Sequence, residues 1–343
     1  MKQISTGASG LSIGSLFNSH SAGAKNQLSD KSAVSFVTGK DQREASYQAL
    51  KPLENDILKG IQGKQIVIKV NMGQVKKELW LNATDVNFIR GILDFFKPVY
   101  DGKILLAEST AAGAVSTMQG FENFGYQPLL KEYNVSFADL NDRPTIPQWI
   151  LGENFHPLKI NIIDTYLDPN VYLISPTRLK THDNIFATLS LKNVVMGSPI
   201  NRYKQKSREG RNEKPLMHSG GNRGLSYNMF LMAAHGVHPD LAVLDGIVAM
   251  EGSGPVSGDL IEHGVAIAST DWLAADRLGI EMMGIDYREV KYLQWCADAG
   301  MGNDNLSNIE VSGPDYTKHI AHYKLHKNVE TQREWIREDY KTE

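Results

Sequence analysis

The sequence predicts an α/β fold with a largely parallel sheet, helices on both faces and one long basic loop insertion. Short apolar runs of strand length alternate with amphipathic stretches of helix length along most of the 343 residues. Several of these runs are continuously apolar, which is typical of strands buried on both faces. Strands that alternate with helices at this spacing favour βαβ units.

The first expected elements lie between residues 65 and 133. Gln65–Asn71 is a continuous apolar strand, and Lys103–Glu108 is the next buried strand. Between them, Asp85–Phe96 carries apolar residues at helical spacing, with Thr84 as the expected N-cap. Val115–Tyr133 is expected to be helical in part.

Further short strands are expected at Val135–Leu140, Val171–Ser175, Leu241–Leu244 and Gly264–Ala268. The segment that follows the last of them opens a helix, for which Asp271 is the expected N-cap. These elements define an α/β domain over residues 25–313, followed by a peripheral C-terminal helix or tail over residues 314–343.

Residues 198–224 interrupt this rhythm, because they are polar, glycine-rich and basic without an apolar period. We interpret them as a lid or substrate loop that suits an anionic substrate. A solvated loop is the alternative. Its basic residues, which outnumber Glu209 and Glu213, are Arg202, Lys204, Lys206, Arg208, Arg211, Lys214 and Arg223.

Residues 1–24 have one basic residue, then small residues with scattered Ile and Leu, and end in a Ser-Ala-Gly-Ala stretch that suits cleavage. They resemble the downstream part of a twin-arginine signal, whose arginines would precede Met1. This predicts export to the periplasm by the twin-arginine machinery. The alternative is a disordered N-terminus of a cytoplasmic protein.

Composition excludes several classes of function. The net charge of −3 gives no electrostatic reason to expect nucleic acid, and no apolar run approaches the length of a membrane span. The single cysteine, Cys296, excludes an internal disulfide and an iron–sulfur cluster held by several thiolates of this chain.

Polar and charged side chains follow the expected strands at the point where each strand ends. In open parallel sheets, ligands bind beyond the carboxyl ends of the strands, so these side chains are expected to share one site. The alternative is that strand ends are polar because loops are solvated. The residues are Asn71, Glu108, Asp139, Asp142, Arg178, Lys180, His182 and Asp245.

Residues 175–197 hold the candidate catalytic residues Lys180, His182 and Lys192. A lysine near another cation or in an apolar wall can lose its proton and act as a base or nucleophile, and histidine can move protons. The alternative is a lysine whose ammonium reaches water and a structural histidine. Asn71, Arg178 and Asn193 are candidate substrate-binding residues.

Residues 245–258 place four glycines and a proline around Glu251. The backbone amides of Gly252 and Gly254 are candidates for an anion nest. A turn with a solvated carboxylate is the alternative. The candidate metal ligands are His218, Glu108, Asp245 and Glu251.

Five motifs in this order resemble the family known as domain of unknown function 362, over about Gly63 to Gly313. They are IVIKVNMG, ILLAES, LKTHDNIFATLSLKNVVMG, LDGIVAMEGSGPVSG and ASTDWLAAD. The resemblance implies the fold, a site at the edge of the sheet and twin-arginine export in some lineages. Some relatives carry ferredoxin-like cysteine motifs, which this chain lacks.

The chain is also similar to nickel-dependent lactate racemase, in which a histidine precedes by ten positions the lysine that holds a nickel-pincer nucleotide. Here His182 precedes Lys192 by ten, and His218 follows. This resemblance implies that Lys192 holds the cofactor, His218 binds the metal and His182 acts as acid and base. The glycine-rich run before the family's lysine is absent, and His218 lies farther downstream than in that family.

The leading hypothesis is an exported enzyme that acts on a small anionic substrate, a hydroxy acid or a sugar derivative, by proton or hydride transfer. Its cofactor is unknown, with a transition metal or a nickel-pincer nucleotide as the candidates. The alternative is a non-catalytic periplasmic protein that binds an anion or a metal, or takes part in maturation.

Overall fold

The computed structural model describes residues 31–111, 117–202 and 212–339. The expected export signal in residues 1–24 lies outside the described residues. Among the described residues, no helix has the length and apolarity that a membrane crossing requires. The boundaries expected for the α/β domain and the C-terminal tail stay predictions.

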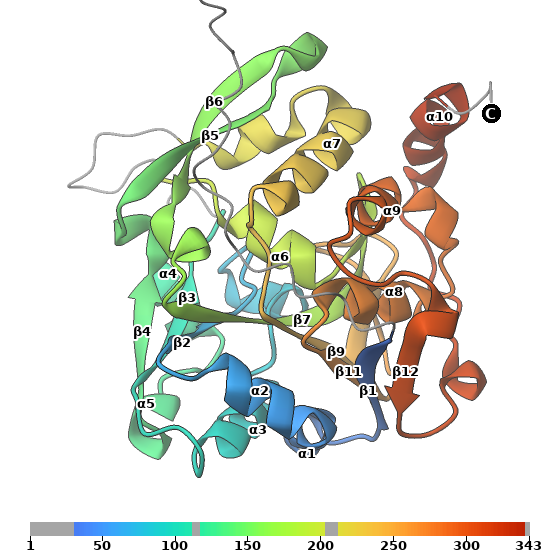
Figure 1. Cartoon of the computed structure of the whole chain (residues 1–343). Helices are drawn as coiled ribbons and strands as arrows, with labels where there is room; N and C mark the ends of the chain where they lie inside the picture. The colour runs from blue at the N-terminus through green and yellow to red at the C-terminus, as the bar shows by residue number, and fades with distance from the viewer. Residues whose placement is uncertain (1–30, 112–116, 203–211, 340–343) are drawn as a thin grey trace, which may run out of the picture.

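A ten-stranded sheet forms the centre of the molecule (Figure 1). Strands β9, β7, β2, β3 and β4 are neighbours in this order and all parallel, which confirms a largely parallel sheet. At the other edge β11 is antiparallel to β9 and to β1, and β1 is parallel to β12. The bounds are β1 Ser32–Thr38, β2 Gln65–Lys69, β3 Ile104–Glu108, β4 Val135–Asp139, β7 Val171–His182, β9 Leu241–Glu251, β11 Val265–Ser269 and β12 Ile309–Ser312.

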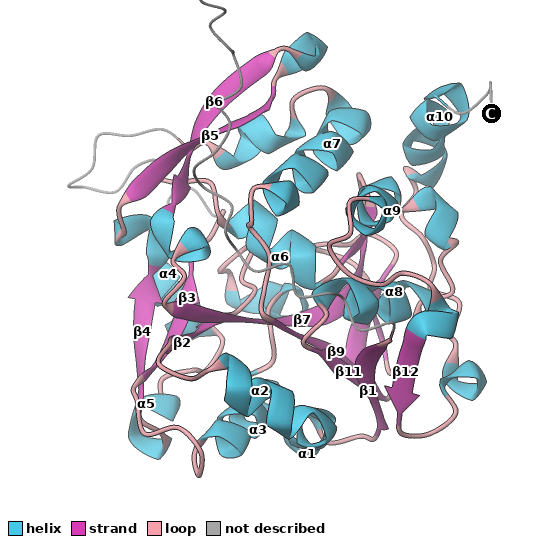
Figure 2. Cartoon of the chain, viewed as in Figure 1, coloured by secondary structure: helices cyan, strands magenta, loops and turns pink. Residues whose placement is uncertain are grey.

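The remaining strands are short or separate from the main path of the sheet. β8 (Phe186–Thr188) pairs with β7, and β10 (Asp259–Ile261) pairs with β9, both antiparallel. β5 (Thr145–Leu151) and β6 (Pro157–Ile163) form a two-stranded ribbon that projects from the body of the molecule (Figure 2).

Helices cover both faces of the sheet, as the sequence predicts (Figures 1 and 2). In strand β2, Ile66 and Ile68 pack into the core formed with α1, α2 and α3, whereas Val67 packs into the core formed with α6, α7 and α8. Alternate side chains of a strand point to opposite faces, so a strand in this position is apolar throughout. The bounds are α1 Gln42–Leu50, α2 Glu54–Gly60, α3 Val86–Phe96, α4 Thr117–Asn123, α5 Leu129–Glu132, α6 Ser190–Gly197, α7 Gly221–Ala234, α8 Trp272–Met282, α9 Lys291–Asp298 and α10 Val329–Asp339.

Two helix N-termini test the expected caps. Asp271 accepts hydrogen bonds from the amides of Leu273 and Ala274 at the start of α8, which confirms it as N-cap. Thr84 is not the N-cap of α3, because Asp85 takes that position. The Thr84 hydroxyl instead accepts from the amide of Asn71 and donates to the carbonyl of Pro176, and so ties the end of β2 to β7.

Two strands run farther than the sequence predicts. β7 continues through Arg178 and Lys180 to His182, and β9 continues through Asp245 to Glu251. These charged side chains therefore lie within strands and not beyond their ends. They are tolerated there because groups from other elements accept their hydrogen bonds or neutralise their charge.

The expected basic loop over residues 198–224 is irregular only in part. Its residues 203–211 lie outside the described residues. A 3₁₀ helix spans Lys214–His218, and α7 begins at Gly221, so the prediction of an uninterrupted loop is wrong for this part. Met217 is fully buried, which anchors this segment to the body of the protein.

The expected C-terminal helix is present as α10. Its Gln332 is almost fully buried, donates to the carbonyl of His182 and accepts from the amide of Phe186. The helix therefore braces the turn between β7 and β8.

Candidate functional site

A cavity of about 480 Å³ lies at the carboxyl ends of β2, β3 and β7, beside helix α6. Seven of the candidate residues from the sequence line it, and they come from five separate segments of the chain. They are Asn71, Glu108, Lys180, His182, Lys192, Asn193 and His218. Segments that lie far apart in the sequence thus meet at one edge of the sheet.

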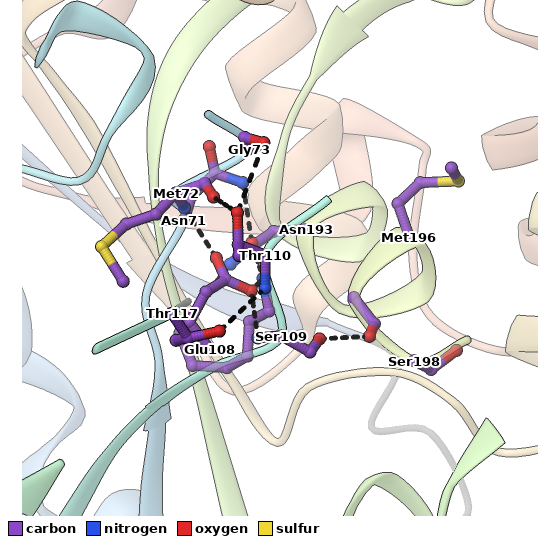
Figure 3. A network of polar contacts seen from close by, with 12 residues as sticks. Asn71, Met72, Gly73, Glu108, Ser109, Thr110, Thr117, Asn193, Met196 and Ser198 are labelled. Atoms are coloured by element: carbon purple, nitrogen blue, oxygen red, sulfur yellow. Dashed lines mark hydrogen bonds and ion pairs between the residues drawn. The ribbon is translucent and has the colours of Figure 1, made fainter. Parts of the chain in front are cut away.

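Glu108, at the end of β3, joins its own segment to the end of β2 in the wall of this pocket. One carboxylate oxygen accepts from the backbone amide of Met72 at 2.6 Å, and the other accepts from the amide of Ser109 at 2.7 Å (Figure 3). The ammonium of Lys69, at the end of β2, lies 2.7 Å from the same carboxylate. Both charged side chains are almost fully buried.

Two asparagines connect the lysines of the pocket. The side-chain oxygen of Asn193 accepts from Lys69 at 2.7 Å and from the amide nitrogen of Asn71 at 2.9 Å. The Asn71 oxygen in turn accepts from Lys180, whose ammonium also donates to the carbonyl of Asn82. Amide side chains with fixed partners hold the lysines in place without neutralising them.

Lys214, from the 3₁₀ helix, is held by three oxygens. Its ammonium donates to the carbonyls of Gly197 and Met196 and to the hydroxyl of Ser109. Burial lowers the pKa of Lys214 to about 7.

Lys192 differs from these lysines. It projects from α6 into the pocket, and among the described residues it has no hydrogen-bond or ion-pair partner. Burial, with the nearby charge of Lys69, lowers its pKa to about 8, although Asp183 acts in the opposite direction. Burial and the charge of Lys192 hold the pKa of Lys180 well below its usual range.

Two neutral imidazoles face the lysines. Burial and the charge of Lys192 hold the pKa of His182 well below its usual value, and the same causes lower the pKa of His218 to about 4. The Nδ1 atom of His182 accepts from the amide of Asn184 at 3.0 Å and lies 3.1 Å from a carboxylate oxygen of Asp183. Asp183 and Asn184, in the turn that follows β7, therefore fix the orientation of the His182 imidazole at its Nδ1 side.

The pocket has more basic side chains than carboxylates. Four lysines line it, namely Lys69, Lys180, Lys192 and Lys214, against the carboxylates of Glu108 and Asp183. Asp183 is partly exposed, whereas Glu108 is already bound to Lys69 and two amides. Groups of one sign in a wall of low dielectric attract an ion of the opposite sign, so the pocket suits an anion.

Asp276 of α8 fixes helix α6, which carries Lys192 and Asn193. Its buried carboxylate accepts from the amide and hydroxyl of Ser190 and from the amide of Leu191. Burial raises the pKa of Asp276 to about 7. The sequence leaves open which way this side chain faces, and the structure places it beneath the start of α6.

Of the strand-end candidates, Asp139, Asp142, Arg178 and Asp245 do not line the pocket. Arg178 is buried and donates to the carbonyls of Val248 and Ala83, and its guanidinium lies 3.7 Å from Asp245. Asp245 also accepts from the side chain of Gln42 and the amide of Ile247. The structure therefore does not bring the expected substrate-binding arginine and metal-binding aspartate together with the other candidates.

The glycine-rich loop contributes through other residues than those expected. Gly252 has φ +70°, and its carbonyl accepts from Thr181, while a side chain at Gly254 would collide with the Thr181 carbonyl. Glu251 accepts from the amide of Lys324, outside the pocket. Pro255 and Val256 are the residues of this loop that line the cavity.

The expected metal ligands do not converge. His218 and Glu108 line the pocket, whereas Asp245 and Glu251 lie outside it. Among residues 31–111, 117–202 and 212–339, no group of three or more His, Cys, Asp or Glu side chains is placed to hold a metal. The lysines also repel a cation, so these residues do not fit a bare metal ion.

Lys69, Asn82 and Ser109 belong to the site, although they are not among the residues expected from the sequence. A lysine inside the apolar run of β2 is a usable signal, since a buried lysine needs a partner. Asn82 and Ser109 carry no such signal. In the sequence, Lys214 is one basic residue among several in the insertion.

Residues 66–281 match the family described as a domain of unknown function, DUF362. The chain is 28% identical over 185 residues to the thylakoid-associated protein sll1697 of Synechocystis sp.. That alignment covers 54% of this chain and 52% of the relative, so the chain spans about half of the relative's length.

The lactate racemase apoprotein from Thermoanaerobacterium thermosaccharolyticum is a structural neighbour, with a TM-score of 0.41 and 15% sequence identity. The comparison covers 74% of this chain and 57% of that chain.

Proposed function

The chain belongs to the DUF362 family, and from its pocket we propose an enzyme that binds a small anionic substrate and moves a proton on it. One observation carries the proposal. Four lysines and two neutral imidazoles line one cavity, and the buried carboxylate among them, Glu108, is already paired with Lys69.

The lysines of the pocket bind the anion. Lys180 and Lys214 are held by fixed oxygens, so their positions do not change when a ligand enters. A carboxylate or phosphate that binds near them is attracted by both charges and accepts from the third N–H of Lys180, since Lys214 already donates all three of its N–H groups. Hydroxy acids and sugar-derived acids are the proposed substrate classes.

The imidazoles supply the proton transfer. A histidine whose pKa is low is neutral at pH 7 and is able to accept a proton. His182 is the proposed base: when its imidazole proton is on Nδ1 and is donated to the carboxylate of Asp183, 3.1 Å away, in place of the hydrogen bond from the Asn184 amide, Nε2 is left to accept a proton from the substrate. His218, the last residue of the 3₁₀ helix, lines the same pocket.

A nickel-pincer nucleotide is compatible with this pocket as one class of bound anion. Lys192, His182 and His218, which the sequence resemblance assigns to it, line the same cavity. Lys192 would hold it and His218 would face its metal. When bound, it would supply a hydride acceptor for a hydroxy acid.

Binding and turnover test the proposal separately. We expect isothermal titration calorimetry to detect one binding site for lactate or phosphate, and the K214M substitution to weaken it at least tenfold. We expect H182Q to retain binding and to lose turnover in a screen of hydroxy acids. Binding that survives in K214M would contradict the anion site, and turnover that survives in H182Q would contradict the assigned base.

A non-catalytic anion-binding protein is the second candidate, and export to the periplasm, proposed from residues 1–24, suits either. A non-catalytic protein should show the same loss of binding in K214M, and its wild type should show no turnover.

A further inference from the structure

Lys192 is the lysine in this pocket whose amine has no partner among the described residues. Lys69 is bound to Glu108 and Asn193, and Lys180 to Asn71 and Asn82. Lys214 uses all three N–H groups of its ammonium on oxygens. Lys192 faces the same cavity, and within the described part of the chain no acceptor binds it.

An amine in this setting has an available electron pair when it is deprotonated. Its pKa of about 8 leaves about a tenth of it uncharged at pH 7, compared with roughly 0.03% for an ordinary lysine. Burial therefore raises the reactive fraction by about two orders of magnitude.

We propose that Lys192 forms a reversible imine with the carbonyl carbon of a small oxo acid in this pocket. This substrate class rests on the proposed anion-binding function, since Lys180 and Lys214 would hold the carboxylate. His182 and His218 line the same cavity and supply and remove the protons.

The step balances without any oxidant or reductant. The uncharged Lys192 nitrogen attacks the carbonyl carbon, loses one of its two protons to a base, and the carbonyl oxygen takes a proton, which gives a carbinolamine. The hydroxyl then takes a second proton and leaves as water as the C–O bond breaks, and the nitrogen lone pair forms the C=N bond of an iminium that keeps the remaining N–H proton. The iminium withdraws electrons from the adjacent carbon, so that His182 can remove a proton from it.

Reductive trapping tests the proposal with pyruvate as the probe. Full-length protein is incubated with pyruvate and sodium cyanoborohydride, and the modified peptide is identified by mass spectrometry. We expect modification at Lys192, at least tenfold faster than at any other lysine and at least tenfold faster than with uncharged acetone. K192R should lose it, whereas K131R, which changes an exposed lysine on α5, should retain it.

Exchange of the pyruvate methyl protons in D₂O, followed by NMR, gives a second readout. We expect wild-type protein to accelerate this exchange, K192R to abolish it, and H182Q to slow it at least tenfold while the trapped adduct persists.

Calorimetry with pyruvate separates the failure of this inference from the failure of the proposed function. Pyruvate that binds without trapping at Lys192 would overturn the imine and leave the anion site intact. Neither binding nor trapping would overturn both. Trapping at Lys180 or at exposed lysines, or a purified protein whose Lys192 peptide already carries a covalent group, would also overturn the inference.

Discussion

The ammonium of Lys69 lies 2.7 Å from the carboxylate of Glu108, and these two residues end the neighbouring strands β2 and β3. Each is only 2–3% exposed in its side chain. A buried charge is costly without a partner, so the pair has to be present whenever the strands are together. The pair forms part of the pocket wall, which the other three lysines also line.

The first prediction concerns this pair. E108Q leaves Lys69 buried without its counter-ion and the amides of Met72 and Ser109 with a weaker acceptor, so it should lower the free energy of unfolding by about 3–5 kcal/mol. Urea denaturation measures this change. E132Q removes a partly exposed partner of Arg90 and should cost less than about 1 kcal/mol. Equal effects of the two substitutions would show that the buried pair has no special role.

The second prediction concerns Lys192. Because burial disfavours its charge and no described residue accepts from it, K192M should raise the free energy of unfolding at pH 7 by about 1–3 kcal/mol. The folded pKa lies below the unfolded one, so this gain is complete below about pH 8 and fades toward about pH 10. K192R keeps the charge and should show no gain. A destabilised K192M would contradict the account.

The third prediction concerns His218. Its pKa of about 4 in the folded state lies below the value of about 6.5 expected in the unfolded chain. The unfolded chain therefore binds the proton first as the pH falls, and stability is lost between about pH 6.5 and pH 4. H218Q should lose less stability than the wild type over this range in denaturation series at several pH values. Parallel curves for the two proteins would contradict this assignment.

The fourth prediction concerns Asp276, which lies outside the pocket. D276N replaces one acceptor oxygen by a donor that faces the backbone amides of α6, and should destabilise the fold by about 1–3 kcal/mol. It should also weaken lactate binding, because α6 carries Lys192 and Asn193. D315N, at an exposed turn, should leave both unchanged. Unaltered binding in D276N would mean that α6 is positioned by other contacts.

The central strands are predictable because burial on both faces leaves a continuous apolar run. Strand β1, second from the edge, is not, since SAVSFVT mixes small polar and apolar residues, and the ribbon of β5 and β6 lies outside the main sheet. The apolar sequence pattern predicts ends for β7 and β9 that are too early, because charged residues usually mark loops. Their partners, such as Asp245 for Arg178 and Asn71 for Lys180, lie far away in the sequence.

The candidate site is predictable in part for the same physical reason. The carboxyl edge of the parallel strands is predictable as the place where polar residues gather, and seven of the expected residues meet in the pocket there. Which way a charged residue inside a strand points depends on partners that spacing does not reveal, so Arg178 and Asp245 lie elsewhere than expected. Lys214 reaches the pocket through a 3₁₀ helix within a segment that the sequence predicts as a loop.

Calorimetric titration of the wild-type protein with lactate and with phosphate, between about pH 6 and pH 9 in buffers of different ionisation enthalpy, tests the central claim most directly. A bound anion stabilises the charged forms of Lys192 and Lys214, whose pKa values are about 8 and about 7. We predict proton uptake on binding and an affinity that falls as the pH rises through this range. Absence of binding, or an affinity that does not change with pH, would contradict a cationic pocket built for an anion.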